Sequence, residues 1–132
     1  MNSIKLYVMV GIGGSIGAIL RYGMSSIHDL FTKTNTFPLA TLVTNLIGCF
    51  LLSFILNHRH MKAKIRSDYL VALTAGVLGA FTTFSTVMVE TFDLWLHHLS
   101  LAIIYVGLSV IGGLIFCYSG YKLATREVQS YK

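Results

Sequence analysis

Apolar residues run almost without interruption through four stretches of the chain, at residues 4–27, 37–56, 69–92 and 99–121. A bilayer core about 30 Å thick is crossed by roughly 20 residues of apolar helix, so each stretch is long enough to span it. The runs are continuous and lack the alternation of polar and apolar positions that marks the strands of a membrane barrel. The pattern predicts an all-α membrane protein, with four transmembrane helices in a single domain over residues 1–132.

Polar residues gather in three short connections between these stretches. Residues 28–36 contain Asp29 and Lys33, residues 57–68 read NHRHMKAKIRSD, and residues 93–98 read DLWLHH. The tryptophan and two histidines of the last connection are typical of a membrane–water interface. We therefore expect all three connections to lie at or beyond the membrane surface.

The composition agrees with burial of most of the chain in lipid. Hydrophobic residues make up 55% of the 132 residues and charged residues only 11%, and the mean hydropathy is +0.71. A soluble domain carries about a quarter charged residues, so a polar coat is missing and a soluble enzyme is excluded. The two cysteines, Cys49 and Cys117, lie inside apolar runs and are interpreted as small buried hydrophobes.

Basic residues are divided unequally between the two sides of the membrane. With four spans, the two termini and the second connection share one side, and the other side holds Arg21 and Lys33. Lysine and arginine accumulate on the cytoplasmic side of membrane proteins, so both termini are predicted to be cytoplasmic, in a multi-pass protein of the cell membrane. Topology thus explains the net charge of +5, and no nucleic-acid partner is expected. The first side holds eight basic residues: Lys5, Arg59, Lys62, Lys64, Arg66, Lys122, Arg126 and Lys132.

The first predicted helix carries glycines three or four residues apart, followed by Arg21. Such glycines give a flat helix face against which another backbone can pack. The text GIGGSIG is similar to a dinucleotide-binding loop, but it lies inside a span and no predicted strand precedes it. Arg21 lies near the end of the helix, where it either extends to the interface or faces an aqueous vestibule and attracts anions. The sequence leaves both interpretations open.

The second predicted helix places Thr41, Asn45 and Gly48 on one face. An asparagine in the middle of a membrane needs partners, because an unpaired amide in hydrocarbon costs several kcal/mol. Asn45 therefore makes a hydrogen bond between helices, or it lines a polar path as a donor.

The third predicted helix contains two glycines, Gly76 and Gly79, and then a run of hydroxyl groups that weakens a helix. A broken helix exposes main-chain carbonyl groups, which are tolerated in a membrane only when they are buried in protein, line a cavity or bind an ion. Such oxygens suit an alkali cation. The alternative is a continuous helix whose hydroxyls bond back to carbonyls four residues earlier. The run after the glycines is Thr82, Thr83, Phe84, Ser85 and Thr86.

The fourth predicted helix places Tyr105, Ser109, Gly112 and Gly113 on one face, which forms either a track of hydroxyl groups or a packing surface. A small hydrated anion needs hydrogen-bond donors to replace its water, and Asn, Thr, Ser, Tyr and aromatic ring edges supply them. No lysine or arginine lies in the middle of a span to trap the anion, and fast conduction requires weak binding. No acid lies there to couple transport to protons.

In all four predicted helices the sequence resembles the fluoride channel family called Fluc or CrcB. The matching text is GGSIGAILRY at 13–22, ATLVTNLIGCF at 40–50, GVLGAFTTFST at 76–86 and YVGLSVIGG at 105–113. The resemblance implies a dual-topology, antiparallel dimer with two narrow pores at the subunit interface. It also implies passive export of fluoride from the cytoplasm, which protects the cell from fluoride toxicity, and no enzymatic activity.

The resemblance further implies a structural sodium ion where the two broken third helices cross. By position, its carbonyl ligands would be Gly79 and Thr82. Asn45 matches the pore asparagine and Phe84 the first of two pore phenylalanines, and Arg21 closes the first-helix motif at the vestibule. The remaining matched residues are Glu90, an acid at the far end of the third helix, and the pore residues Thr83, Ser85, Tyr105 and Ser109.

The chain departs from the family pattern in three respects. Val87 stands where the second phenylalanine is expected, and Gly113 stands where a hydroxyl is often found. The bias of eight basic residues to two is also unusual for a chain that must insert in both directions. These departures suggest a heterodimer with a related chain of opposite orientation, in which one of the two pores is degenerate.

Two other functions are consistent with a chain of this size. A small four-helix multidrug exporter needs a carboxylate in its first helix for proton exchange, and none is present here. A non-conducting assembly subunit would use every polar residue only to pack helices. The closely spaced histidines lack the further ligands that a metal site requires: His58, His60, His97 and His98.

Overall fold

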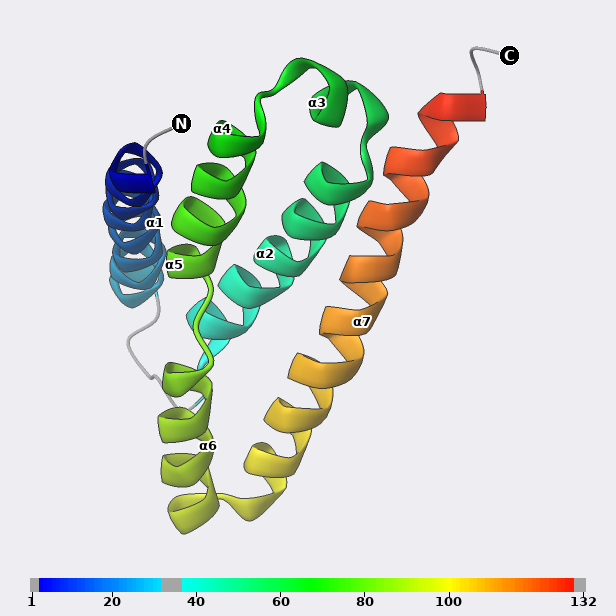
Figure 1. Cartoon of the computed structure of the whole chain (residues 1–132). Coiled ribbons are helices and arrows are strands. Elements are labelled where there is room, and N and C mark those ends of the chain that lie inside the picture. Colours follow the sequence, from blue (N-terminus) through cyan, green and yellow to red (C-terminus); the bar gives the residue numbers. More distant parts are fainter. Residues whose placement is uncertain (1–2, 32–36, 130–132) are drawn as a thin grey trace.

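The computed structural model describes residues 3–31 and 37–129, and helices account for nearly all of them (Figure 1). Within these residues, four helical stretches are long and apolar enough to cross a membrane: Ser3–Leu30, Leu39–Asn57, Ser67–His97 and Leu99–Arg126. No strand occurs among them. The prediction of an all-α protein with four potential spans is confirmed. The elements are α1 (Ser3–Phe31), α2 (Leu39–Asn57), α3 (Arg59–Lys64), α4 (Ser67–Val71), the π-helical segment η1 (Ala72–Leu78), α5 (Gly79–Phe81), α6 (Ser85–His97) and α7 (Leu99–Gln129).

The helices extend further than hydropathy predicts. Residues 93–98, expected to form a connection, continue α6 as far as His97, so only His98 separates α6 from α7. The side chain of His97 bonds back to the Asp93 carbonyl oxygen at 2.9 Å, which favours helix in this exposed polar segment. The expected connection at 57–68 contains the short helix α3, which begins with the His58 side chain accepting from the Met61 N–H at 3.3 Å. Residues 32–36 of the first connection lie outside the described part.

Close approach of two backbones joins α1 to the third span. A Cβ at Gly13 would lie 2.7 Å from the Ala72 carbonyl oxygen, and a Cβ at Gly76 would lie 2.8 Å from that of Val10. At Gly17 a Cβ would collide with a carbonyl oxygen of η1. Contacts this short leave no room for any side chain, so the flat glycine face predicted for the first helix is confirmed and lies against η1 and α5.

The buried apolar core lies where α2, α6 and α7 meet. Leu42, Val87, Leu94, Ala102 and Tyr105 form it, and Phe37 packs edge-on against the Tyr105 ring at 5.6 Å between centroids. Large apolar side chains remain exposed along α1 and α7, including Ile4, Ile19, Ile103, Ile111 and Leu114. These surfaces suit lipid or a second chain.

The start of α1, the end of α7 and α3 lie at one end of the molecule, and α6 lies at the other (Figure 1). The third span is therefore divided along its length. Its first part, α4 to α5, packs on α1 at the end where α1 begins, and α6 packs on α7 at the opposite end.

Candidate functional site

The third span is broken between α5 and α6, and Asn45 of α2 holds the break. The N–H of Thr83 donates to Asn45 Oδ1 at 2.8 Å, and Asn45 Nδ2 donates to the Thr83 carbonyl oxygen at 2.9 Å. One amide therefore satisfies both backbone groups of a residue that has left the helix, as a membrane interior requires. The predicted break is confirmed, as is the hydrogen bond between helices. The continuous-helix alternative is wrong.

Main-chain carbonyl groups lose their usual helical donors at this break. In an α-helix each N–H donates to the carbonyl oxygen four residues earlier, so the Thr83 N–H would donate to the Gly79 carbonyl oxygen. In the same way, the Thr86 N–H would donate to the Thr82 carbonyl oxygen. The Thr83 N–H instead donates to Asn45, and the Thr86 N–H donates to Thr83 Oγ1 at 3.2 Å. The carbonyl oxygens of Gly79 and Thr82 are thus among those that lose a helical donor at the break, and side chains take over both donors.

A cavity of about 550 Å³ opens beside the break, between α2, the third span and α7. Most of its wall area is apolar, and none of its lining residues is charged. Phe84 lines this cavity and is 76% exposed. The Ser109 Oγ is buried and has no hydrogen-bond partner among the described residues, although an unpaired buried hydroxyl is costly. Six of the predicted site residues line this one cavity: Asn45, Gly79, Thr82, Thr83, Phe84 and Ser109.

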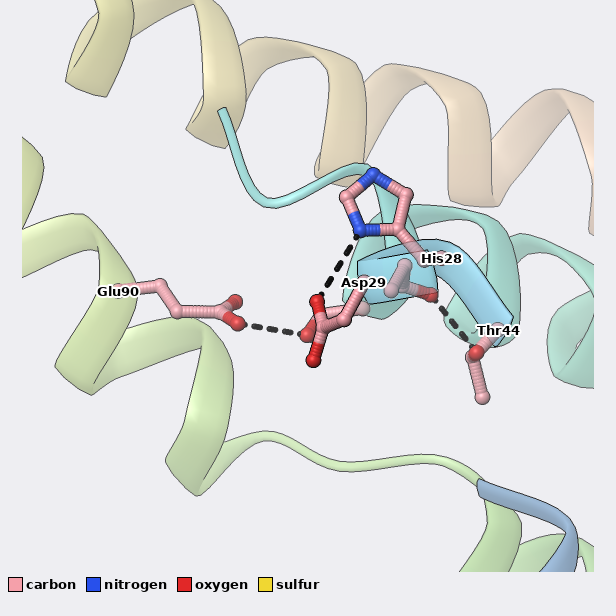
Figure 2. A network of polar contacts seen from close by, with 6 residues as sticks. His28, Asp29, Thr44 and Glu90 are labelled. Carbon is pink, nitrogen blue, oxygen red and sulfur yellow. Dashed lines mark hydrogen bonds and ion pairs between the residues drawn. The ribbon is translucent and has the colours of Figure 1, made fainter. Parts of the chain in front are cut away.

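Glu90 joins three helices at the far end of the site, and it was not among the predicted pore residues. Its Oε1 accepts a hydrogen bond from Thr41 of α2 at 2.7 Å (Figure 2). Its Oε2 accepts from the hydroxyl of Tyr105 of α7 at 2.6 Å. Hydrogen bonds to a carboxylate are among the stronger ones, so the three side chains fix α2, α6 and α7 to one another. The signal in the sequence was a single acid near the end of an otherwise uncharged span.

Tyr105 and Ser85 differ from the other predicted pore residues in their surroundings. Tyr105 is fully buried in the apolar core with its hydroxyl on Glu90, and it does not line the large cavity. Ser85 is exposed, with its hydroxyl 3.4 Å from that of Thr83. Most of the predicted site residues therefore line the cavity at the break, whereas Tyr105 and Ser85 lie next to it.

Arg21 lines a smaller cavity of about 290 Å³ on the other side of the break. Hydroxyl groups of Thr41, Thr44, Thr83 and Thr86 contribute to the same walls. No ion-pair partner of Arg21 is found within residues 3–31 and 37–129. A half-buried guanidinium among hydroxyl groups favours anions in its surroundings, and the vestibule role of Arg21 stays a prediction.

The two departures from the family pattern have clear structural surroundings. Val87 is 7% exposed and packs in the apolar core, while also reaching the wall of the large cavity. A Cβ at Gly113 would lie 3.6 Å from Cys49 Sγ, at ordinary contact distance, so α2 and α7 are close there. Neither position supplies a ring edge or a hydroxyl to the cavity.

Comparison with known proteins places this geometry in a family. The family model described as CrcB-like protein, Camphor Resistance (CrcB), matches residues 8–121. "Fluoride-specific ion channel FluC 1" of Bacillus cereus (strain ATCC 10987 / NRS 248) is 42% identical over 128 residues, covering 96% of this chain and 92% of the relative. "Fluoride-specific ion channel FluC 2" of Listeria innocua is 40% identical over 121 residues, covering 91% of each chain. The chain therefore belongs to the CrcB family.

Proposed function

We propose that this chain forms a channel through which fluoride leaves the cytoplasm passively, lowering fluoride toxicity. Its relatives of about 42% identity are named fluoride-specific ion channels, and their matches cover most of this chain. A family of ion channels also excludes an enzymatic role. The four apolar helices make it a multi-pass membrane protein. The eight basic residues at one end support insertion into the cell membrane with both termini in the cytoplasm.

The observation that carries this proposal is the composition of the cavity beside the break. The buried Ser109 hydroxyl has no partner among the described residues, and Asn45 uses only one of its two amide hydrogens on Thr83. Both side chains line a cavity without charged residues. Neutral donors can replace the water that a small anion gives up, and the absence of a fixed cation keeps the anion from being trapped.

We also propose that a second, antiparallel chain completes this cavity. The cavity is open on one side, where the exposed Phe84 ring lies at its edge. The exposed apolar side chains along α1 and α7 suit another subunit as well as lipid. A partner chain closing the open side would convert the half-cavity into an enclosed path for the ion.

Sodium fits the chemistry of the released carbonyl groups. The described residues contain no cluster of His, Cys, Asp or Glu suited to a metal ion, so side-chain ligands for a transition metal are lacking there. The Gly79 and Thr82 carbonyl oxygens are hard ligands that have lost their helical donors to Asn45 and Thr83. We assign these oxygens to a structural, non-transported sodium ion shared with the second chain. Bound there, sodium would compensate the partial negative charge of the carbonyl groups and join the two broken helices.

The charge distribution favours a related chain over an identical one as the second subunit. An antiparallel copy of this chain would place its end with eight basic residues outside the cell, against the usual bias. Val87 supplies no aromatic ring to the cavity. A heterodimer with one degenerate pore accounts for both features.

Fluoride release from liposomes tests the proposal, with chloride as the control anion and with sodium replaced in parallel. The chain is reconstituted alone and with a companion CrcB chain of opposite charge bias. Ser109→Ala removes a donor that has no hydrogen-bond partner in the described residues, so it should lower fluoride flux without weakening assembly. Ser119→Ala is its control, because Ser119 Oγ is exposed and bonds only to the Ile115 carbonyl oxygen.

Each result of this experiment separates the proposal from its alternatives. Liposomes that retain fluoride with and without the companion chain would contradict channel function and favour an assembly subunit. A tight dimer with full fluoride flux from this chain alone would contradict the heterodimer. Flux and stability that do not change when sodium is removed would contradict the sodium site.

A further inference from the structure

A third cavity, of about 460 Å³, lies at the end of α6 remote from the chain termini, where α1 ends and α2 begins. Its walls carry three carboxylates, Asp29 of α1 and Glu90 and Asp93 of α6. The one basic side chain among its described lining residues is His28. When His28 is neutral, the charged groups that the described lining residues contribute to this cavity are therefore all carboxylates.

His28 is held inside this cavity with one ring nitrogen paired and the other unpaired. Its side chain is 18% exposed, and Nδ1 lies 3.5 Å from Asp29 Oδ1 (Figure 2). Its Nε2 is buried and has no hydrogen-bond partner among the described residues. A neutral ring can pair with Asp29 through Nδ1–H alone, so protonation at Nε2 adds a full charge without breaking an existing bond. Histidine is the side chain that ordinarily changes charge between about pH 5 and pH 8.

This acidic cavity adjoins the cavity that contains Arg21. The two share Ser25 and Thr41 in their walls, and Thr41 also donates to Glu90. The Arg21 cavity also shares Thr83 with the cavity beside the break, so an anion that passes from the break through the Arg21 cavity to this end of the molecule meets the carboxylates. With the termini in the cytoplasm, as proposed above, that end faces outward.

We propose that the charge on His28 sets the rate at which the anion passes the outer cavity, so that flux rises as the pH falls. This inference rests on the proposed fluoride channel. Among the described residues, the ionisable groups that line the cavity with His28 are Asp29 on its own helix and Glu90 and Asp93 on α6. From α2 only the neutral Thr41 among the polar side chains lines the cavity, and α7 acts through the Tyr105 hydroxyl on Glu90.

The sign of the effect follows from the charges. When His28 is neutral, the charged groups that the described lining residues contribute are carboxylates, which repel fluoride. When His28 is protonated, its positive charge beside Asp29 offsets part of the repulsion. One such charge, partly screened by water and salt, should raise fluoride flux about threefold on acidification.

The experiment measures fluoride release from liposomes with the same pH on both sides, so that the orientation of the channel does not matter. Protein-free liposomes correct for leakage of undissociated hydrogen fluoride. His28→Gln should keep flux at the low alkaline level throughout, and His28→Lys should hold it at the high level. His97→Gln is the matched control, because His97 forms a similar 3.5 Å pair with Asp93 but is 65% exposed and does not line the cavity.

The outcomes distinguish this inference from the proposed function. Absence of fluoride release at every pH contradicts the channel itself. Release that is independent of pH, or a rise with acid that persists in His28→Gln, assigns no role to His28 and overturns the inference. If His28→Gln does not assemble, His28→Lys decides, since a pH response retained in that variant also overturns it.

Discussion

Replacing Asn45 by alanine removes both hydrogen bonds that hold the break in the third span. The side chain donates to the Thr83 carbonyl oxygen at 2.9 Å and accepts from its N–H at 2.8 Å. Each bond contributes about 0.5–1.5 kcal/mol, and bonds between membrane helices average nearer the lower value. The variant should therefore be destabilised by about 1–3 kcal/mol, as the sum of the two bonds.

The same substitution should also change how the protein responds to sodium. Without Asn45, the Thr83 N–H can donate to the Gly79 carbonyl oxygen, as in an unbroken helix. That bond would recover part of the lost stability, but it would occupy one of the two oxygens assigned to sodium. Asn45→Ala should thus lose the stabilisation by sodium that we expect of the unmodified protein.

Thermal unfolding in detergent, with sodium or with a large organic cation, measures both effects. Asn57→Ala is the matched control, because Asn57 lies on the same helix and donates only to the Ser53 carbonyl oxygen one turn earlier. It should change stability by no more than about 0.5 kcal/mol. If Asn45→Ala unfolds at the same temperature as Asn57→Ala and responds to sodium like the unmodified protein, the reasoning is refuted.

Two further substitutions test the packing around the site. Gly17→Ala should destabilise the protein by at least about 2 kcal/mol in thermal unfolding, because its Cβ would collide with a backbone carbonyl oxygen of η1. Gly23→Ala, with nothing within 4 Å of the new Cβ, should be neutral or slightly stabilising, and equal effects would contradict the packing. Tyr105→Phe should cost about 1.5–3 kcal/mol by the same measurement, since it removes a 2.6 Å hydrogen bond to a carboxylate. Tyr118→Phe, on the exposed face of α7, serves as its control, and a loss no greater than in that control would show that the bond contributes nothing.

Hydropathy alone predicts the number of spans, because a lipid core accepts only helices whose backbone groups are paired internally. It underestimates their length. Asp93 and His97 are polar, yet they remain helical because their largely exposed side chains pair one turn apart and His97 also bonds to the Asp93 carbonyl oxygen. The run of apolar residues indicates which part of a helix contacts lipid, whereas the helix itself continues as far as its backbone hydrogen bonds do.

The break was predictable because its cause is local. Glycine and hydroxyl residues follow one another between Gly76 and Thr86, and Asn45 is the obvious amide within a neighbouring span. The role of Glu90 was not predictable in this way. Its partners, Thr41 and Tyr105, are 49 and 15 residues away, and only the arrangement of three helices brings them together.

The polar site depends on a glycine that takes no part in its chemistry. Gly48 lies one turn after Asn45 on α2, and a Cβ there would collide with Thr82 Cγ2. A side chain at this position would force Thr82 to rotate and give up its Oγ1 bond to the Leu78 carbonyl oxygen at 2.9 Å, or it would move α2 away from the break. If α2 moved, Asn45 could no longer reach Thr83, whose N–H and carbonyl oxygen would lose their partner as in Asn45→Ala. The released carbonyl oxygens and the cavity beside them therefore exist because a small residue lets one amide approach the chain closely enough to replace a turn of helix.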